Sequence, residues 1–309
     1  MHTLLSRTAP APKATSAPRA ASRHELAFAR DVLRGLGEPR KSVPGRWRQD
    51  AEGIALRSAW IALDPAHPLR LEGSLLAQAV TEIARIAGAG SRLTLADDAS
   101  IALIAPLRDA IGALPAGATC GRPRRRVLYL SGSSTSSLPC EAATAARLAD
   151  VASHGNHDVL VFAAALAPND PTHADHDDSA SSAEQAFNLN LLARINRELG
   201  GDFGAAGFRH HSRFDPLTQC METHLVARVA QRVQVLGRRF EFGSGESIVV
   251  ERAYHQPLAR FEVLARAAGW LHSQLWVHGR GSFALHVLER TEPRDARRSA
   301  IRCEHVIET

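Results

Sequence analysis

The chain is poor in cysteine and tyrosine: its 309 residues include four cysteines and two tyrosines. Cys120, Cys140, Cys220 and Cys303 are widely scattered and form no CxxC pair. This spacing is not typical of a disulfide framework, and it favours reduced thiols in a cytosolic protein. The sequence also lacks any apolar run approaching the ~20 residues of a membrane-spanning helix. We therefore expect a cytoplasmic protein with no membrane partner.

The excess of positive charge is small as well, with a formal net charge of +5 and 22% charged residues. The densest basic run, RPRRR at 122–126, is short and has no interleaved aromatic residues. Such a run is more typical of a solvated loop before a strand than of a nucleic-acid site. We expect no nucleic-acid partner, and the apolar fraction of 45% is typical of a globular protein.

The first 23 residues contain Ala, Pro, Ser and basic residues but no acid. This composition predicts a disordered tail, and it is also similar to an organellar transit peptide. Because the same Ala and Arg bias runs through the whole chain, we interpret the segment as the tail of a bacterial protein.

From about His24 the pattern predicts alternating helices and strands. Apolar residues at helical spacing predict a helix from His24 to Gly37. Helices are then expected at 72–87, 100–114 and 140–154, alternating with strands at 92–96, 127–130 and 159–165. This alternation predicts a parallel sheet with crossover helices.

Beyond a polar loop at 169–182 the pattern changes. After a helix at 183–199, short alternating runs predict strands at 222–229, 232–235, 238–242 and 246–250. A helix at 258–268 and strands around 275–278 and 282–289 follow. The predicted architecture is α/β with a second subdomain of antiparallel strands.

Several strings carry a family resemblance. They are AFNLNLLARINRELGGDF (186–203), METHLVARVAQRV (221–233), FEFGSGESI (240–248), ERAYH (251–255), RGSFALHVL (280–288) and GLGEPRKSVP (35–44). Together they resemble the histidine-specific, S-adenosylmethionine-dependent methyltransferase family, which includes the hercynine-forming enzyme of ergothioneine biosynthesis. The resemblance implies a Rossmann-like cofactor domain and a substrate domain, the latter built from the N-terminal segment and the antiparallel insert.

The resemblance and the pattern together predict domain boundaries. We expect a tail at 1–23 and an α+β substrate-type domain formed by 24–71 and 170–255. A reduced, truncated Rossmann-like methyltransferase domain is expected to comprise 72–169 and 256–309.

The expected cofactor site lacks its signals. The family has a Gly-Ser-Gly-like turn and Lys-Thr after the first strand, whereas here Asp97, Asp98, Ala99 and Ser100 follow it. A Rossmann-type site needs such glycines, and an acid about 20 residues further on binds the ribose. From Ala96 to Val127 there is also no room for the second and third strands of the family's sheet. We expect a sheet reduced by two strands and no bound cofactor, although the family uses S-adenosylmethionine.

The expected substrate site is altered too. The family's GSTIGN motif becomes SGSSTSSLP (131–139), with Ser137 nearest to the Asn that helps to hold the substrate's amino-acid end. Of the imidazole-facing positions, Glu251 keeps its acid, while a serine has become Ala253 and a methionine has become Thr223. The tyrosine-bearing stretches YD-x-x-G and PEYYPTR-x-E match only in frame, at 49–53 and 64–72. A remnant substrate site would therefore comprise Glu251, Thr223, Ala253 and Ser137. Glu251 could accept a hydrogen bond from an imidazole or ammonium group, or be a solvated or strand-pairing glutamate.

Other polar groups have simpler interpretations. HADHDD (173–178) has the ligand types of a hard-metal or zinc site but no second cluster, so we expect a solvated loop and no metal. His210 and His211 are expected at the surface, and Cys140 and Cys220 as small apolar fillers. No nucleophile with a paired base stands out, so no catalytic residue is assigned.

The helix at 183–199 is expected to pack in the core. One helical stripe carries Phe187, Leu191, Ile195 and Leu199. Asn188 and Asn190 flank this stripe, and their amides can tie loops to the helix.

These features predict a non-catalytic family member, a pseudoenzyme that serves as a binding or regulatory subunit. Its partner would be an active paralogue, a pathway enzyme or a small amino-acid-like ligand. The alternative is an active N-methyltransferase that acts on the α-amino group of histidine or a related amino acid, with the methyl donor entering through a rebuilt site.

Overall fold

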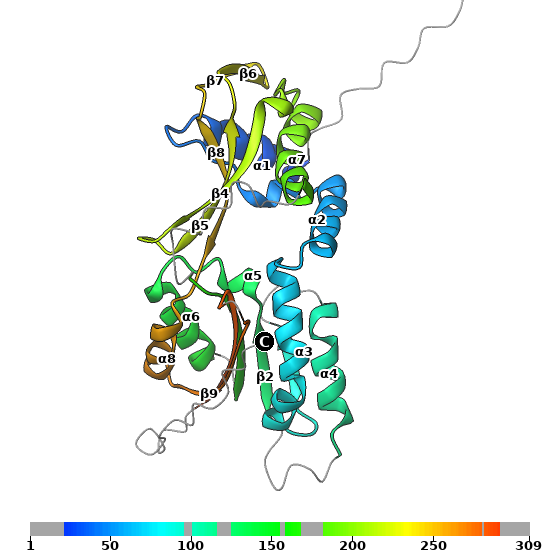
Figure 1. The fold of residues 1–309 in the computed structure, drawn as a ribbon, viewed down its shortest axis with the longest axis vertical. Helices are drawn as coiled ribbons and strands as arrows, with labels where there is room; N and C mark the ends of the chain where they lie inside the picture. Colours follow the sequence, from blue (N-terminus) through cyan, green and yellow to red (C-terminus); the bar gives the residue numbers. More distant parts are fainter. Residues whose placement is uncertain are drawn as a thin grey trace, which may run out of the picture.

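The computed structural model describes residues 22–95, 101–115, 125–154, 158–167, 182–279 and 281–290. Its elements form two halves stacked along the longest axis of the molecule (Figure 1). One half is built on a five-stranded sheet and the other on a three-stranded sheet with a separate hairpin.

The five-stranded sheet has the strand order β1-β2-β3-β10-β9. Its strands are β1 (Arg92–Leu95), β2 (Arg126–Leu130), β3 (Val159–Ala165), β10 (Phe283–Arg290) and β9 (Trp270–Val277). The first three are parallel, and β10 is antiparallel to both of its neighbours. Strand β9 therefore runs in the same direction as β1, β2 and β3, and β10 alone is reversed.

Helices cover both faces of this sheet. Helices α3 (Pro68–Ala87) and α4 (Ile101–Ala113) pack on one face, and α6 (Glu141–His154) and α8 (Leu258–Ala267) pack on the other. Strand β3 reads VLVFAAA and is buried on both faces, as expected for a parallel strand between two helical layers. The short helix α5 (Gly132–Thr135) follows the carboxyl end of β2.

The other half is antiparallel. Strands β4 (Phe208–Asp215), β5 (Cys220–Ala227) and β8 (Ser247–Tyr254) form the three-stranded sheet, and β6 (Gln231–Val235) and β7 (Arg238–Phe242) form the hairpin. Around them lie α1 (Arg23–Leu36), η1 (Gly45–Arg48), α2 (Ala51–Leu63), α7 (Ser182–Leu199) and η3 (Ala205–Gly207). The core of this half joins apolar residues of α1 and α7 to those of the strands.

The predicted fold class is confirmed: the structure is α/β, with a parallel sheet and a separate set of antiparallel strands. Five strands form the larger sheet in the part of the chain that the structure describes, and the expected loss of two strands stays a prediction. Strand β1 forms one edge of the sheet and β9 the other, and the residues of β1 are exposed or half-buried. The domain boundaries stay predictions.

Two of the longer elements were not expected from the sequence. Helix α2 buries only Gly53, so its apolar residues show no helical stripe. Strand β4 does alternate, but polar residues occupy half of its inward positions. These positions are Phe208, His210, Ser212 and Phe214.

Candidate functional site

The acid singled out by the sequence lies on the face of the three-stranded sheet that carries the core. Glu251 on β8 is the cross-strand partner of Thr223 on β5, and Thr223 is in turn opposite Ser212 on β4. The Ser212 and Thr223 hydroxyl oxygens lie 3.4 Å apart. The pairing shifts by a bulge directly after Thr223. Bulges re-aim side chains near functional sites, so the backbone here presents Glu251 beside a short row of hydroxyl groups.

The other two predicted positions differ in their distance from this row. Ala253 is two residues along β8 from Glu251, on the same face, and pairs with Met221. Ser137 is exposed in the other half of the molecule, in the turn after α5. The backbone N–H of Tyr254 donates to the Ser136 carbonyl at 2.8 Å, so this turn does reach the end of β8. The structure therefore brings Glu251 and Thr223 together and leaves Ser137 on a loop.

The Glu251 carboxylate is bound by Arg48, a residue that the sequence reasoning missed. Arg48 is 3% exposed and donates to Glu251 and to the Asn188 side-chain oxygen. Its Nε donates to the Gly45 carbonyl at 3.2 Å, and its guanidinium lies 4.7 Å from the centre of the Phe187 ring. The sequence signal was weak: Arg48 is one arginine among many, placed just before the stretch that matches YD-x-x-G only in frame.

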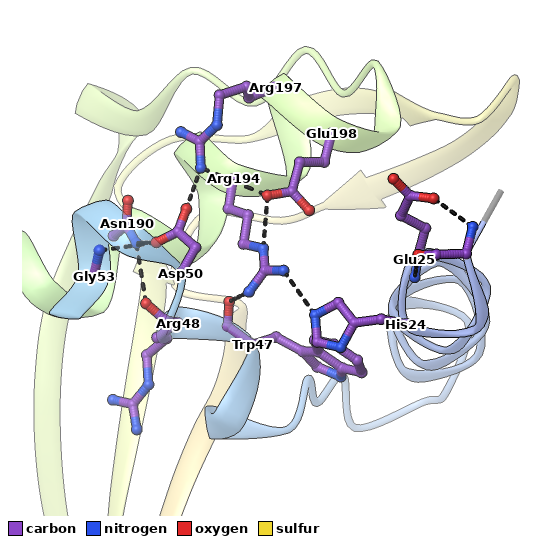
Figure 2. A network of polar contacts seen from close by, with 11 residues as sticks. His24, Glu25, Trp47, Arg48, Asp50, Gly53, Asn190, Arg194, Arg197 and Glu198 are labelled. Carbon is purple, nitrogen blue, oxygen red and sulfur yellow. Dashed lines mark hydrogen bonds and ion pairs between the residues drawn. The ribbon is translucent and has the colours of Figure 1, made fainter. Parts of the chain in front are cut away.

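A second network fixes the backbone of Arg48 (Figure 2). The Asn190 amide donates to the Arg48 carbonyl at 3.0 Å and to Asp50 at 2.8 Å. Asp50 caps α2 by accepting from the Gly53 N–H at 2.8 Å. A methyl group at Gly53 would overlap the Arg48 carbonyl. The expectation that Asn188 and Asn190 tie a loop to their helix is confirmed, because both bind Arg48.

The electrostatics favour an ionised acid beside the arginine. Desolvation alone would raise the pKa of Glu251, whose side chain is still 46% exposed, but the charge and hydrogen bond of Arg48 outweigh it and hold that pKa below its usual value. His67 caps α3 through its ring, accepting from the Leu69 N–H at 3.1 Å. Burial, reinforced by the charge of Arg57, lowers the pKa of His67 to about 4. His67 is therefore neutral near pH 7, and Arg48 is the cation in contact with Glu251.

The prediction that His210 lies at the surface is wrong. It points inward from β4 and is 4% exposed, with its Nε2 3.2 Å from the Ser212 hydroxyl and 3.4 Å from Glu184. The unexpected strand β4 is the reason, because alternation turns every second residue toward the core. His211 is half-buried on the opposite face, paired with His224.

The carboxyl end of β2 is also occupied by the chain's own polar groups. Glu72 of α3 is 1% exposed and accepts from the Tyr129 hydroxyl at 2.8 Å and from the Gly132 N–H at 3.1 Å. A methyl group at Gly132 would lie 2.6 Å from Cζ of Phe283. The N–H of Gly132, the first residue of α5, is therefore directed at an internal carboxylate.

Other expectations have mixed outcomes. The turn at 97–100 and the HADHDD segment at 173–178 lie outside the described residues. Among the residues that the structure does describe, no group of three His, Cys, Asp or Glu side chains is placed to hold a metal ion. Cys220 is buried, and burial raises its thiol pKa to about 11, whereas Cys140 is exposed and is not a filler. None of the helices that the structure describes is long and apolar enough to cross a bilayer.

The open sheet, with helices on both faces and one reversed strand, defines a Rossmann-like α/β protein carrying an antiparallel insert. Residues 101–290 match the model of the S-adenosylmethionine-dependent, histidine-specific methyltransferases, and the chain belongs to this family. The family resemblance stated from the sequence is thereby confirmed.

Two curated relatives are similar along most of their length. A histidine N-alpha-methyltransferase of Mycolicibacterium smegmatis is 28% identical, over 85% of this chain and 95% of the relative. One of Mycobacterium tuberculosis is 27% identical, over 84% and 94%. Among solved structures, the CcbJ methyltransferase of Streptomyces caelestis gives a TM-score of 0.35 at 12% identity, covering 70% of this chain and 96% of its own.

Proposed function

We propose that this chain is a non-catalytic member of the histidine-specific methyltransferase family, and that it serves as a binding or regulatory subunit. The position of β1 carries this proposal. In doubly wound sheets the ligand binds at the carboxyl ends of the strands, in the crevice where the strand order reverses. Among the described strands, β1, β2 and β3 follow one another in a single direction, and β1 has a neighbour on one side only. The sheet therefore offers no crevice of this kind beside β1.

The length of the chain between β1 and β2 supports the same proposal. Between Leu95 and Arg126 the sequence has room for α4, which takes 13 residues, and for two short connections. Two further strands with their crossovers would need far more, since one βαβ unit takes about 30 residues. The strand that would carry a ribose-binding acid therefore has no sequence from which to form.

The substrate side supports it independently. An amino acid that binds through Glu251 would share this carboxylate with Arg48, which bonds one of its oxygens; the Glu251 side chain is 46% exposed. The amide of Gly132, at the turn that matches the family's GSTIGN motif, is bound by Glu72. Both of these groups therefore have a bonding partner within the chain. As a binding or regulatory subunit, the protein would pair with an active paralogue or a pathway enzyme in the cytoplasm.

One alternative function has its own support. The similarity to two histidine N-alpha-methyltransferases covers most of the chain, and the acid at 251 is retained. An active enzyme would methylate the α-amino group of histidine or a related amino acid, in a pathway of the ergothioneine type. It would require a methyl-donor site outside the missing strands.

A methyl-transfer assay separates the two functions. The purified protein is incubated with S-adenosylmethionine and histidine, and the products are analysed by mass spectrometry. The histidine methyltransferase of Mycolicibacterium smegmatis serves as the positive control under the same conditions. We expect no methylated histidine from this chain. Turnover that depends on protein concentration would refute the non-catalytic assignment and favour the alternative.

A further inference from the structure

We infer that the retained acid of the substrate site belongs to a guanidinium-binding site, and that the ligand of this site is Arg48 of the same chain. The inference goes beyond the proposed function, because it concerns the amino-acid side of the molecule and does not depend on the cofactor. It assigns a ligand class to Glu251 and explains why that acid is retained.

The surroundings of Arg48 match a guanidinium group. Its three nitrogens donate to a carboxylate, a side-chain amide oxygen and a backbone carbonyl, which belong to Glu251, Asn188 and Gly45. The planar cation lies over the Phe187 ring at 4.7 Å. A guanidinium combines five donors in one plane with a face that stacks on aromatic rings. A lysine ammonium or an imidazole could not satisfy all four partners at once.

Three of the four partners of Arg48 are positioned without its help. Glu251 is set by strand pairing with Thr223. Asn188 is oriented by its own amide, which donates to the Glu184 carbonyl at 3.1 Å. Phe187 is stacked on Trp60, with ring centres 5.8 Å apart. Removal of the Arg48 side chain should therefore leave an arranged but empty site.

An attached arginine also opposes the binding of external ligands. Because Arg48 is tethered beside its partners, it competes with a free amino acid at a high effective concentration. An incoming imidazole or ammonium group that took the Glu251 oxygen bound by Arg48 would leave a buried guanidinium without its carboxylate, which is strongly unfavourable. Arg48 thus competes with any external ligand for the Glu251 oxygen that it bonds.

The test is chemical rescue of Arg48→Ala. Thermal denaturation and calorimetric titration are carried out with methylguanidinium, and sodium chloride at equal ionic strength corrects for screening. We expect methylguanidinium to raise the melting temperature of R48A and leave the wild type unchanged, with binding to R48A at least about tenfold tighter, or about 1.4 kcal/mol. Arg232→Ala, which removes an exposed arginine from the hairpin, is the matched control and should show no rescue.

The double variant R48A/E251Q decides whether the acid is the recognition element. It should lose the methylguanidinium effect that R48A shows. Equal responses of R48A, R232A and the wild type would overturn the inference, and so would equal binding by R48A and the double variant.

Should R48A fail to fold, Arg48→Met keeps the length and the packing on Phe187 without the charge. In R48M the pKa of Glu251, followed by carboxyl-carbon NMR, should rise above its wild-type value. An unchanged pKa would overturn the inference on its own. None of these readouts involves S-adenosylmethionine, so failure here is distinguishable from failure of the proposed function.

Discussion

The hydroxyl of Tyr129 donates a buried hydrogen bond of 2.8 Å to the carboxylate of Glu72. Tyr129 is the last residue but one of β2, and Glu72 lies in the first part of α3. The carboxylate of Glu72 also accepts from the Gly132 N–H, so two groups at the carboxyl end of β2 are bonded to a side chain of α3. The carboxylate of Glu251 likewise has a partner within the chain, the guanidinium of Arg48.

Tyr129→Phe should therefore lower stability without changing the packing. A buried carboxylate that loses one donor costs about 1–3 kcal/mol in the free energy of unfolding. Denaturant titration of the wild type and Y129F measures this difference. Tyr254→Phe is the control, since Tyr254 is half-buried at the end of β8. Equal, small losses in both variants would show that the Tyr129–Glu72 bond contributes little.

Gly53→Ala should destabilise the segment that carries Arg48. The added methyl group would overlap the Arg48 carbonyl and come within 2.8 Å of the Asn190 amide nitrogen. Overpacking of this kind costs about 1–3 kcal/mol. Gly112→Ala is the matched control, because that helical glycine has no atoms within 4 Å of the added methyl and should gain about 0.4–1 kcal/mol. A neutral G53A variant would contradict the close approach of η1 to α2.

His67→Asn should flatten the dependence of stability on pH. Asparagine is a good helix cap, so the α3 start is retained. In the wild type the unfolded chain binds a proton below its pKa of 6.5, whereas the folded chain does so only near pH 4. Stability is therefore lost as the pH falls through this window, by roughly 3 kcal/mol at pH 4 for this group. Above pH 6.5 the two proteins should have the same slope. If the wild type and H67N have the same slope between pH 6.5 and 4, the pKa of His67 in the folded chain is not lowered.

The sequence predicted the elements whose burial follows a simple period. Strand β3 is an unbroken apolar run, and α7 carries an apolar stripe, so both were expected close to their observed bounds. Strand β4 was missed because His210 and Ser212 occupy inward positions that pattern rules reserve for apolar residues. Helix α2 was missed because its apolar residues are spread around the helix.

The site was predictable only in part. Glu251 and Thr223 were placed together through the family resemblance, and strand pairing brings them into register. Arg48 precedes Asn188 by 140 residues, and their contact depends on the tertiary packing of η1 against α7. Pattern rules place a charged side chain at the surface, because such side chains are rarely fully buried unless they are paired. A buried arginine therefore gives no signal in the sequence. Its partner can be found only once the fold is known.

The central claim, that the sheet no longer holds a methyl donor, is tested most directly by calorimetric titration with S-adenosylmethionine. S-adenosylhomocysteine and histidine are titrated in the same way, and the Mycolicibacterium smegmatis relative is the positive control. We predict that S-adenosylmethionine does not bind this chain more tightly than a Kd of ~1 mM, or about −4 kcal/mol. Saturable binding in the micromolar range would contradict the account, because it would require a donor site that β1 at the edge of its sheet does not provide.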